Sequence, residues 1–154
     1  QGVYMSHIMI ISNREPEPLK LSAFVDLAEY VLKVEGAPEA SEVSIAIVDE
    51  SEIAELNERY RHKEGPTDVL SFPCDEVAAV VAEGEPLTLG DVILAPAIAE
   101  ANARELGNTI EAELNLLVVH GVLHLLGYDH IEDDEAAVMQ AREKSILEAW
   151  ELQA

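Results

Sequence analysis

The sequence is poor in cysteine and has no long apolar run. Its single cysteine, Cys74, excludes a secreted scaffold held together by disulfide bonds. No apolar run approaches the roughly 20 residues of a membrane span, and the run 8–11 is too short for the core of a signal peptide. We therefore expect a cytoplasmic protein that makes no contact with a membrane.

Basic residues are also scarce. Lys and Arg number nine against 31 Asp and Glu, so the formal net charge is −22. A chain with this charge repels polyanions, which excludes nucleic-acid binding through the field of the whole molecule. Any contact with a nucleic acid must come from a local cationic surface.

The overall amino-acid composition is that of a globular protein. Of 154 residues, 49% are apolar and 26% are charged, which suits one domain with a buried core. Gln1 is not a natural initiator, so residues 1–6 are interpreted as an expression remnant or a flexible N-terminus. The single domain is then predicted to cover residues 7–154.

Hydrophobic periodicity predicts an α/β (α+β) fold in which helices surround a small mixed β-sheet. The predicted strands are 7–11, 43–48, 66–73 and 91–94, and the predicted helices are 19–34, 52–60, 96–106, 109–126 and 134–150. Asp49 or Ser51 is expected to cap the second helix, and Asn108 with Glu111 to form a capping box at the fourth. The acidic segment 75–88 is predicted to be a loop or a weak hairpin.

The fourth predicted helix carries the strongest functional signal. From Leu114 onward it is apolar on nearly every side, which is typical of a buried central helix. His120 and His124 are four residues apart, so both project from one face with Cβ atoms roughly 6 Å apart. Gly127 permits a sharp reversal that would bring His130 back toward them. The spacing His-x3-His-x2-Gly-x2-His is that of zinc metalloproteases, and it predicts a zincin-like metal site.

Three ordinary core or surface histidines are the alternative interpretation. Unpaired buried imidazoles would cost free energy, so a shared metal ion is favoured. Three neutral nitrogens suit one Zn²⁺, with nickel or another divalent metal possible, and they leave a coordination position open as catalytic sites do. Asp129 is either a carboxylate that orients a ligand imidazole without binding the metal itself, or simply a turn residue.

Gly121 bears on the reaction. In the protease motif the residue after the first histidine is the glutamate base, and here it is glycine. A zinc-dependent peptidase lacking that base remains an alternative, with Glu113 or Asp129 as substitutes, but a phosphodiester substrate is favoured. A third alternative is a non-enzymatic binding factor whose metal is structural, which would need a fourth protein ligand.

The one locally cationic stretch contains Arg59, Arg61 and Lys63. A solvated helix end is the simple explanation, but a guanidinium can also grip a phosphate with two hydrogen bonds beside a metal. Tyr128 and Tyr60 are candidates to stack on bases, whereas Phe72 is better explained by core packing.

Four blocks of sequence together resemble the YbeY family of bacterial ribosome-maturation endoribonucleases, in the same order and over nearly the whole chain from about residue 7 to Trp150. They are Leu56-Asn57-Glu58-Arg59-Tyr60-Arg61, Pro66-Thr67-Asp68-Val69-Leu70-Ser71-Phe72-Pro73, Leu89-Gly90-Asp91-Val92-Ile93, and His120-Gly121-Val122-Leu123-His124-Leu125-Leu126-Gly127-Tyr128-Asp129-His130. The histidine block with glycine after the first histidine is the most specific of these.

The resemblance implies an α/β fold with the metal helix at its centre and metal-dependent cleavage of single-stranded RNA. It further implies a role in maturing the 3′ end of small-subunit ribosomal RNA and in ribosome quality control, with the small subunit and its proteins as partners. His120, His124 and His130 match the family's metal-binding histidines, and Arg61 matches its catalytic or RNA-binding arginine. Since the chain is acidic, we expect the metal, Arg61 and Lys63 to form a narrow cationic cleft, with Arg59 and Tyr128 as weaker RNA contacts.

Overall fold

The computed structural model describes residues 7–13, 21–37, 41–73, 87–128 and 132–152. Its strands are β1 (His7–Asn13), β2 (Ser41–Ile47), β3 (Val69–Pro73) and β4 (Leu87–Leu94). Its helices are α1 (Leu21–Val34), α2 (Glu50–Arg61), α3 (Pro96–Leu106), α4 (Ile110–Leu125) and α5 (Asp133–Leu152). Every predicted helix and strand is present, and the α/β fold class is confirmed. No helix in these ranges is both long and apolar enough to cross a bilayer.

The four strands form one mixed sheet in the order β1-β2-β4-β3. The β1–β2 and β2–β4 pairs are parallel, whereas β3 runs antiparallel to β4. β3 therefore lies at one edge of the sheet, where its terminal proline, Pro73, removes a backbone donor at little cost.

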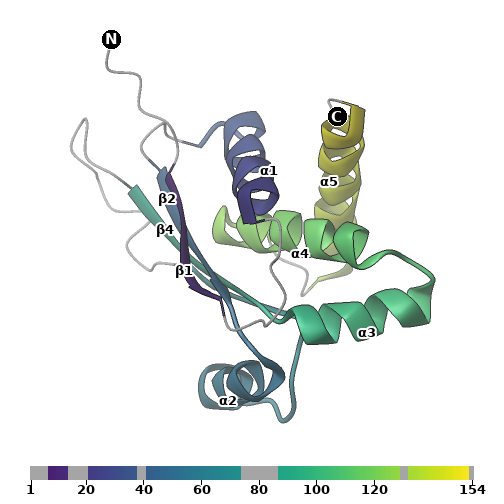
Figure 1. Cartoon of the computed structure of the whole chain (residues 1–154). Helices are drawn as coiled ribbons and strands as arrows, with labels where there is room; N and C mark the ends of the chain where they lie inside the picture. Colours follow the sequence, from purple (N-terminus) through teal and green to yellow (C-terminus); the bar gives the residue numbers. More distant parts are fainter. Residues whose placement is uncertain (1–6, 14–20, 38–40, 74–86, 129–131, 153–154) are drawn as a thin grey trace.

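The two faces of the sheet are covered differently (Figure 1). Val43, Ile45 and Val92 point into the main core, which they form with residues of α1 and α4. Ala46 and Ile93 point to the opposite face and pack with Ile53 of α2. The alternation along each strand thus places α2 on one face and α1, α4 and α5 on the other, whereas α3 contributes Ala99 to the larger core and Ile98 to the smaller one.

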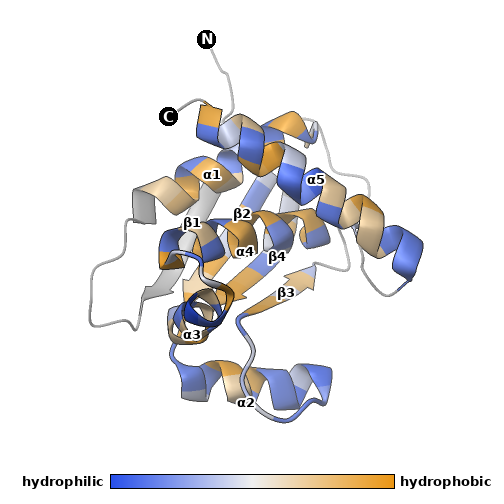
Figure 2. Ribbon diagram, turned by 90° about the vertical axis from the view of Figure 1, so that its right-hand side faces the viewer, coloured by the Kyte–Doolittle hydropathy of each residue, from blue (hydrophilic) through white to orange (hydrophobic). Residues whose placement is uncertain are grey.

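Helix α4 lies at the centre of the larger core, as its apolar surface predicts. It contacts α1, α3, α5, β3 and β4, and Figure 2 shows its largely hydrophobic residues enclosed between the sheet and α5. Its N-cap is Thr109, whose side chain accepts a hydrogen bond from the Ala112 backbone N–H at 3.0 Å. The predicted capping box at Asn108 is therefore wrong by one residue, because the helix begins one residue later and Thr109 is its N-cap.

Strand β4 begins earlier than the sequence predicts, because it contains a bulge. Its pairing with β2 passes from Glu42–Thr88 to Val43–Gly90, so Leu89 is an extra residue, and its side chain is buried. Gly90 has φ +141°, and a Cβ atom there would come within 2.3 Å of the Phe72 carbonyl oxygen. The glycine is thus part of the strand and allows close packing of β3 on β4.

Candidate metal centre

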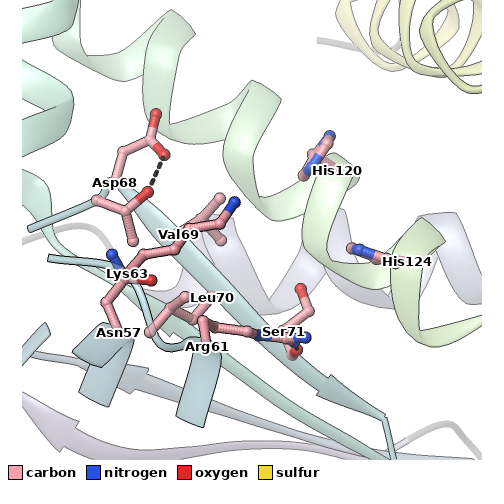
Figure 3. Close-up of a pocket in the computed structure, with 10 residues that line it drawn as sticks. Asn57, Arg61, Lys63, Asp68, Val69, Leu70, Ser71, His120 and His124 are labelled. Atoms are coloured by element: carbon pink, nitrogen blue, oxygen red, sulfur yellow. Dashed lines mark hydrogen bonds between the residues drawn. The ribbon is translucent and has the colours of Figure 1, made fainter. Parts of the chain in front are cut away.

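A cavity of about 470 Å³ opens between α4, β3 and the C-terminal end of α2 (Figure 3). It is lined by Asn57, Arg61, Lys63, Thr67, Asp68, Val69, Leu70, Ser71, His120 and His124. These residues come from two separate segments of the chain, 57–71 and 120–124, so the cavity exists only in the folded protein. Four of the residues singled out from the sequence, Arg61, Lys63, His120 and His124, meet there.

His120 and His124 lie one turn apart on the same face of α4, as their spacing predicts. Their ring centroids are 6.1 Å apart and the ring planes meet at 75°. His130 and Asp129 lie outside the described residues, so their predicted roles are untested. Within the described part of the chain, no group of three or more His, Cys, Asp or Glu side chains is placed to hold a metal ion.

A buried carboxylate on α5 orients the first histidine. Glu143 Oε2 lies 2.6 Å from His120 Nδ1, and Glu143 itself is only 7% exposed. The two ring nitrogens point in nearly opposite directions, so this contact turns Nε2 of His120 away from α5 and toward the cavity that the ring lines. A carboxylate bound to one nitrogen of a histidine whose other nitrogen faces a polar cavity is the usual arrangement at protein zinc sites. The donor chemistry therefore fits a divalent cation.

Glu143 could have been noticed in the sequence. It follows Met139 by four residues and precedes Ile146 by three, and all three side chains are buried on one face of α5. A carboxylate within the apolar stripe of a helix needs a partner. The partner, His120, is 23 residues away and could not be identified without the fold.

Arg61 is fixed at the opposite wall of the cavity. Its Nη2 donates a hydrogen bond to the Ser71 carbonyl oxygen of β3, and its guanidinium carbon lies 5.2 Å from the centroid of the Phe72 ring. A guanidinium has five N–H donors in one plane, so a single bond to β3 orients the group and leaves donors for a ligand. The location of β3 at the sheet edge lets an α2 side chain reach its backbone.

The segment between α2 and β3 is held by two side-chain amides. The buried Asn57 donates to the Gly65 carbonyl oxygen at 2.9 Å, and Asn102 of α3 donates to Asp68 Oδ2 at 3.1 Å. Both contacts secure the stretch that carries Lys63 to the cavity. Neither asparagine was assigned a role from the sequence alone, because each acts on a loop that only the fold brings near it.

Gly121 has a structural explanation. A Cβ atom at this position would lie 2.7 Å from Val92 Cγ1 on β4 and 3.4 Å from the Ser71 hydroxyl oxygen. The glycine lets α4 approach the sheet closely enough for Ser71 and both histidines to line one cavity. A glutamate base at position 121 would point into β4, so the site has no room for the protease arrangement.

Two weaker candidates lie outside this cavity lining. Arg59 pairs with Glu55 on the exposed side of α2 at 3.3 Å. The Tyr128 hydroxyl donates to Glu35 Oε1 at 2.6 Å, and Arg142 donates to the other oxygen of the same carboxylate. The hydrogen bond to Glu35, reinforced by burial, raises the pKa of Tyr128, and the same carboxylate raises the pKa of Arg142. Tyr128 therefore joins α1, α5 and the turn after α4.

Replacing Glu143 with alanine is expected to weaken zinc binding by about 10- to 100-fold, because His120 loses the carboxylate that orients it. The measurement is a competition titration against a chromophoric chelator. Glu143→Gln, which keeps an acceptor oxygen but no charge, should lose less. The control is Glu148→Ala, an exposed carboxylate on the same helix. Equal zinc affinity in folded Glu143→Ala and in the control would contradict this role.

Comparison with known proteins agrees with this geometry. The family model described as "Endoribonuclease YbeY" matches residues 11–151. The chain is 48% identical over 132 residues to an Endoribonuclease YbeY of Acidothermus cellulolyticus, covering 82% of this chain and 80% of that protein. It is 39% identical over 142 residues to an Endoribonuclease YbeY of Thermobifida fusca, covering 91% and 92%.

A solved structure shares the fold. The solution structure of TM1509 from Thermotoga maritima matches with a TM-score of 0.65 and 36% sequence identity, over 92% of this chain and 87% of that one. The family match covers all the residues that line the cavity. On the sequence, the fold and the arrangement of this site, the chain belongs to the YbeY family.

Proposed function

We propose that the protein is an endoribonuclease that cleaves single-stranded RNA with the help of one divalent metal ion, Zn²⁺ in the first place, held by His120, His124 and His130. The endoribonuclease activity follows from membership of the family. The proposed biological role is maturation of the 3′ end of small-subunit ribosomal RNA and ribosome quality control in the cytoplasm. The small ribosomal subunit and its proteins are the proposed partners.

The observation that carries this proposal is the meeting of two histidines with two cations in one cavity. Arg61 and Lys63 lie across the space from His120 and His124 (Figure 3). RNA is a polyanion and the chain carries a net charge of −22, so binding requires a site whose local charge differs from that of the molecule. A metal ion beside two basic side chains supplies such a site.

Each group in the cavity has a distinct task in the proposed reaction. A divalent cation, which His120 and His124 would hold with His130, would supply Lewis-acid polarisation of a phosphodiester oxygen. Arg61, already fixed by Ser71, donates hydrogen bonds to the phosphate as negative charge builds on its oxygens in the transition state. Lys63 adds a second positive charge without fixed direction. Glu143 keeps the His120 ring in place during these events.

The peptidase alternative is not favoured. The family match is to endoribonucleases, and position 121, where the protease motif has its base, is occupied by a glycine packed against Val92. A buried neighbour leaves no path from that position to a peptide in the cavity.

The test is digestion of four substrates by the full chain: single-stranded RNA, the same RNA annealed to its complement, the corresponding DNA, and casein. Only the single-stranded RNA is expected to be cut, a chelator should stop cleavage, and added Zn²⁺ should restore it. Casein digestion would revive the peptidase interpretation. Unfolding on chelation without any RNA cleavage would instead indicate a structural metal.

A further inference from the structure

One aromatic ring next to the cavity is exposed to solvent. Tyr60, in the last turn of α2, is 55% exposed and is the only exposed Phe, Tyr or Trp side chain among the described residues. The other described Phe, Tyr and Trp rings are buried or half-buried. A single exposed apolar side chain is ordinary on a protein surface, so the neighbours of the ring have to indicate a ligand.

The ring is joined to the cavity wall through Phe72 and Arg61. Tyr60 meets Phe72 of β3 in an edge arrangement, with centroids 5.6 Å apart and planes at 72°. The Arg61 guanidinium lies 5.2 Å from the centroid of the same Phe72 ring. Phe72 thus supports both Arg61, which lines the cavity, and Tyr60, which lies outside its lining.

Three basic residues lie close to Tyr60 in the sequence, although Glu58 and Glu64 lie among them. Arg61 and Lys63 follow Tyr60, and the Arg59 guanidinium carbon lies 6.0 Å from the centroid of the Tyr60 ring. Arg59 is partly neutralised by Glu55 at 3.3 Å, so Arg61 and Lys63 supply most of the local positive charge. An aromatic face beside cations that contact phosphates is the combination that binds single-stranded nucleic acid.

We propose that Tyr60 is a stacking site for one unpaired nucleobase of the RNA, next to the phosphodiester held in the cavity. This inference rests on the proposed function and names the element that selects single strands. A base in a duplex is already stacked and paired, so it reaches Tyr60 only at the cost of unstacking. Phe72 acts as a positioning residue, because its contacts keep Tyr60 and Arg61 side by side.

The experiment measures binding and cleavage separately in the full, metal-loaded chain. The binding probe is a fluorescent 2′-O-methyl single-stranded RNA, recovered afterwards to show that it stayed intact. Tyr60→Ala is expected to weaken binding about 5- to 150-fold, which corresponds to one lost base stack. Tyr60→Trp should retain affinity, because the larger ring stacks equally well. The control is Leu106→Ala, which removes another exposed apolar side chain away from the cavity.

A second probe carries one abasic position, scanned along the same oligonucleotide. When the abasic position is the one that stacks on Tyr60, the wild type should bind the abasic probe more weakly than the intact probe. Tyr60→Ala should bind the two probes equally well, since the base and the ring form one interaction. Unchanged affinity of Tyr60→Ala for the intact probe would overturn the stacking site, even if the enzyme cleaves RNA. A loss of affinity in a protein that cuts no RNA would overturn the proposed function and leave the stacking site standing.

Discussion

The Arg61→Ala variant is expected to cleave single-stranded RNA at least ~100-fold more slowly than the wild type and to keep its metal content. The reason is electrostatic: Arg61 is fixed at the cavity wall by Ser71 and by Phe72, so it is ready to meet charge that develops on the phosphate. Loss of one preorganised donor typically costs about 10²–10³ in rate. The measurement is kcat on a short RNA, with zinc determined in the same preparation.

Two further variants make this result specific. Arg61→Lys keeps the charge but not the planar fork of donors, so its rate should lie between those of the wild type and Arg61→Ala. Arg104→Ala removes an exposed arginine that pairs with Glu100 on α3 and should have wild-type activity. Wild-type activity in Arg61→Ala would remove Arg61 from the mechanism.

Replacing either His120 or His124 with alanine is expected to abolish stoichiometric zinc binding and to reduce cleavage to background. His120 and His124 provide two of the three proposed ligands. The two ligands left after either substitution are too few to hold the ion against water. Elemental analysis of the purified variants, with the chain shown to be folded by circular dichroism, checks the result. His130→Ala should behave in the same way if His130 is the third ligand.

The matched control for the histidine variants is His62→Asn. His62 has a left-handed backbone, φ 59°, and is exposed outside the cavity lining. Asparagine tolerates this conformation, so the substitution removes an imidazole without straining the chain. Its zinc content should equal that of the wild type. A full equivalent of zinc in His120→Ala or His124→Ala would contradict the proposed ligand set.

Local sequence signals predict most of the elements and half of the site. Pro96 and Gly107 bound α3 as expected, and Asp49 caps α2 by accepting from the Glu52 N–H at 2.8 Å. The four-residue spacing predicts that His120 and His124 share a face, since helix geometry alone decides it. The start of β4 could not be predicted, because the bulge at Leu89 depends on its pairing with β2.

The contacts between segments far apart in the chain could not be predicted from the sequence. Periodicity places Arg61 at the end of a helix, but nothing in the neighbouring sequence indicates that its guanidinium donates a hydrogen bond to the backbone of β3. The same is true of Glu143, which reaches a histidine on another helix. The resemblance to a known family predicted that these motifs act together, whereas the geometry explains how they come together.

The C-terminal helix supports the proposed metal site from two consecutive positions. Glu143 orients His120, and its neighbour Arg142 shares Glu35 with Tyr128, the residue that leads into the segment containing His130. A chain still being synthesised lacks both supports until α5 has been made. The proposed centre is therefore organised only once α5 has packed against α4.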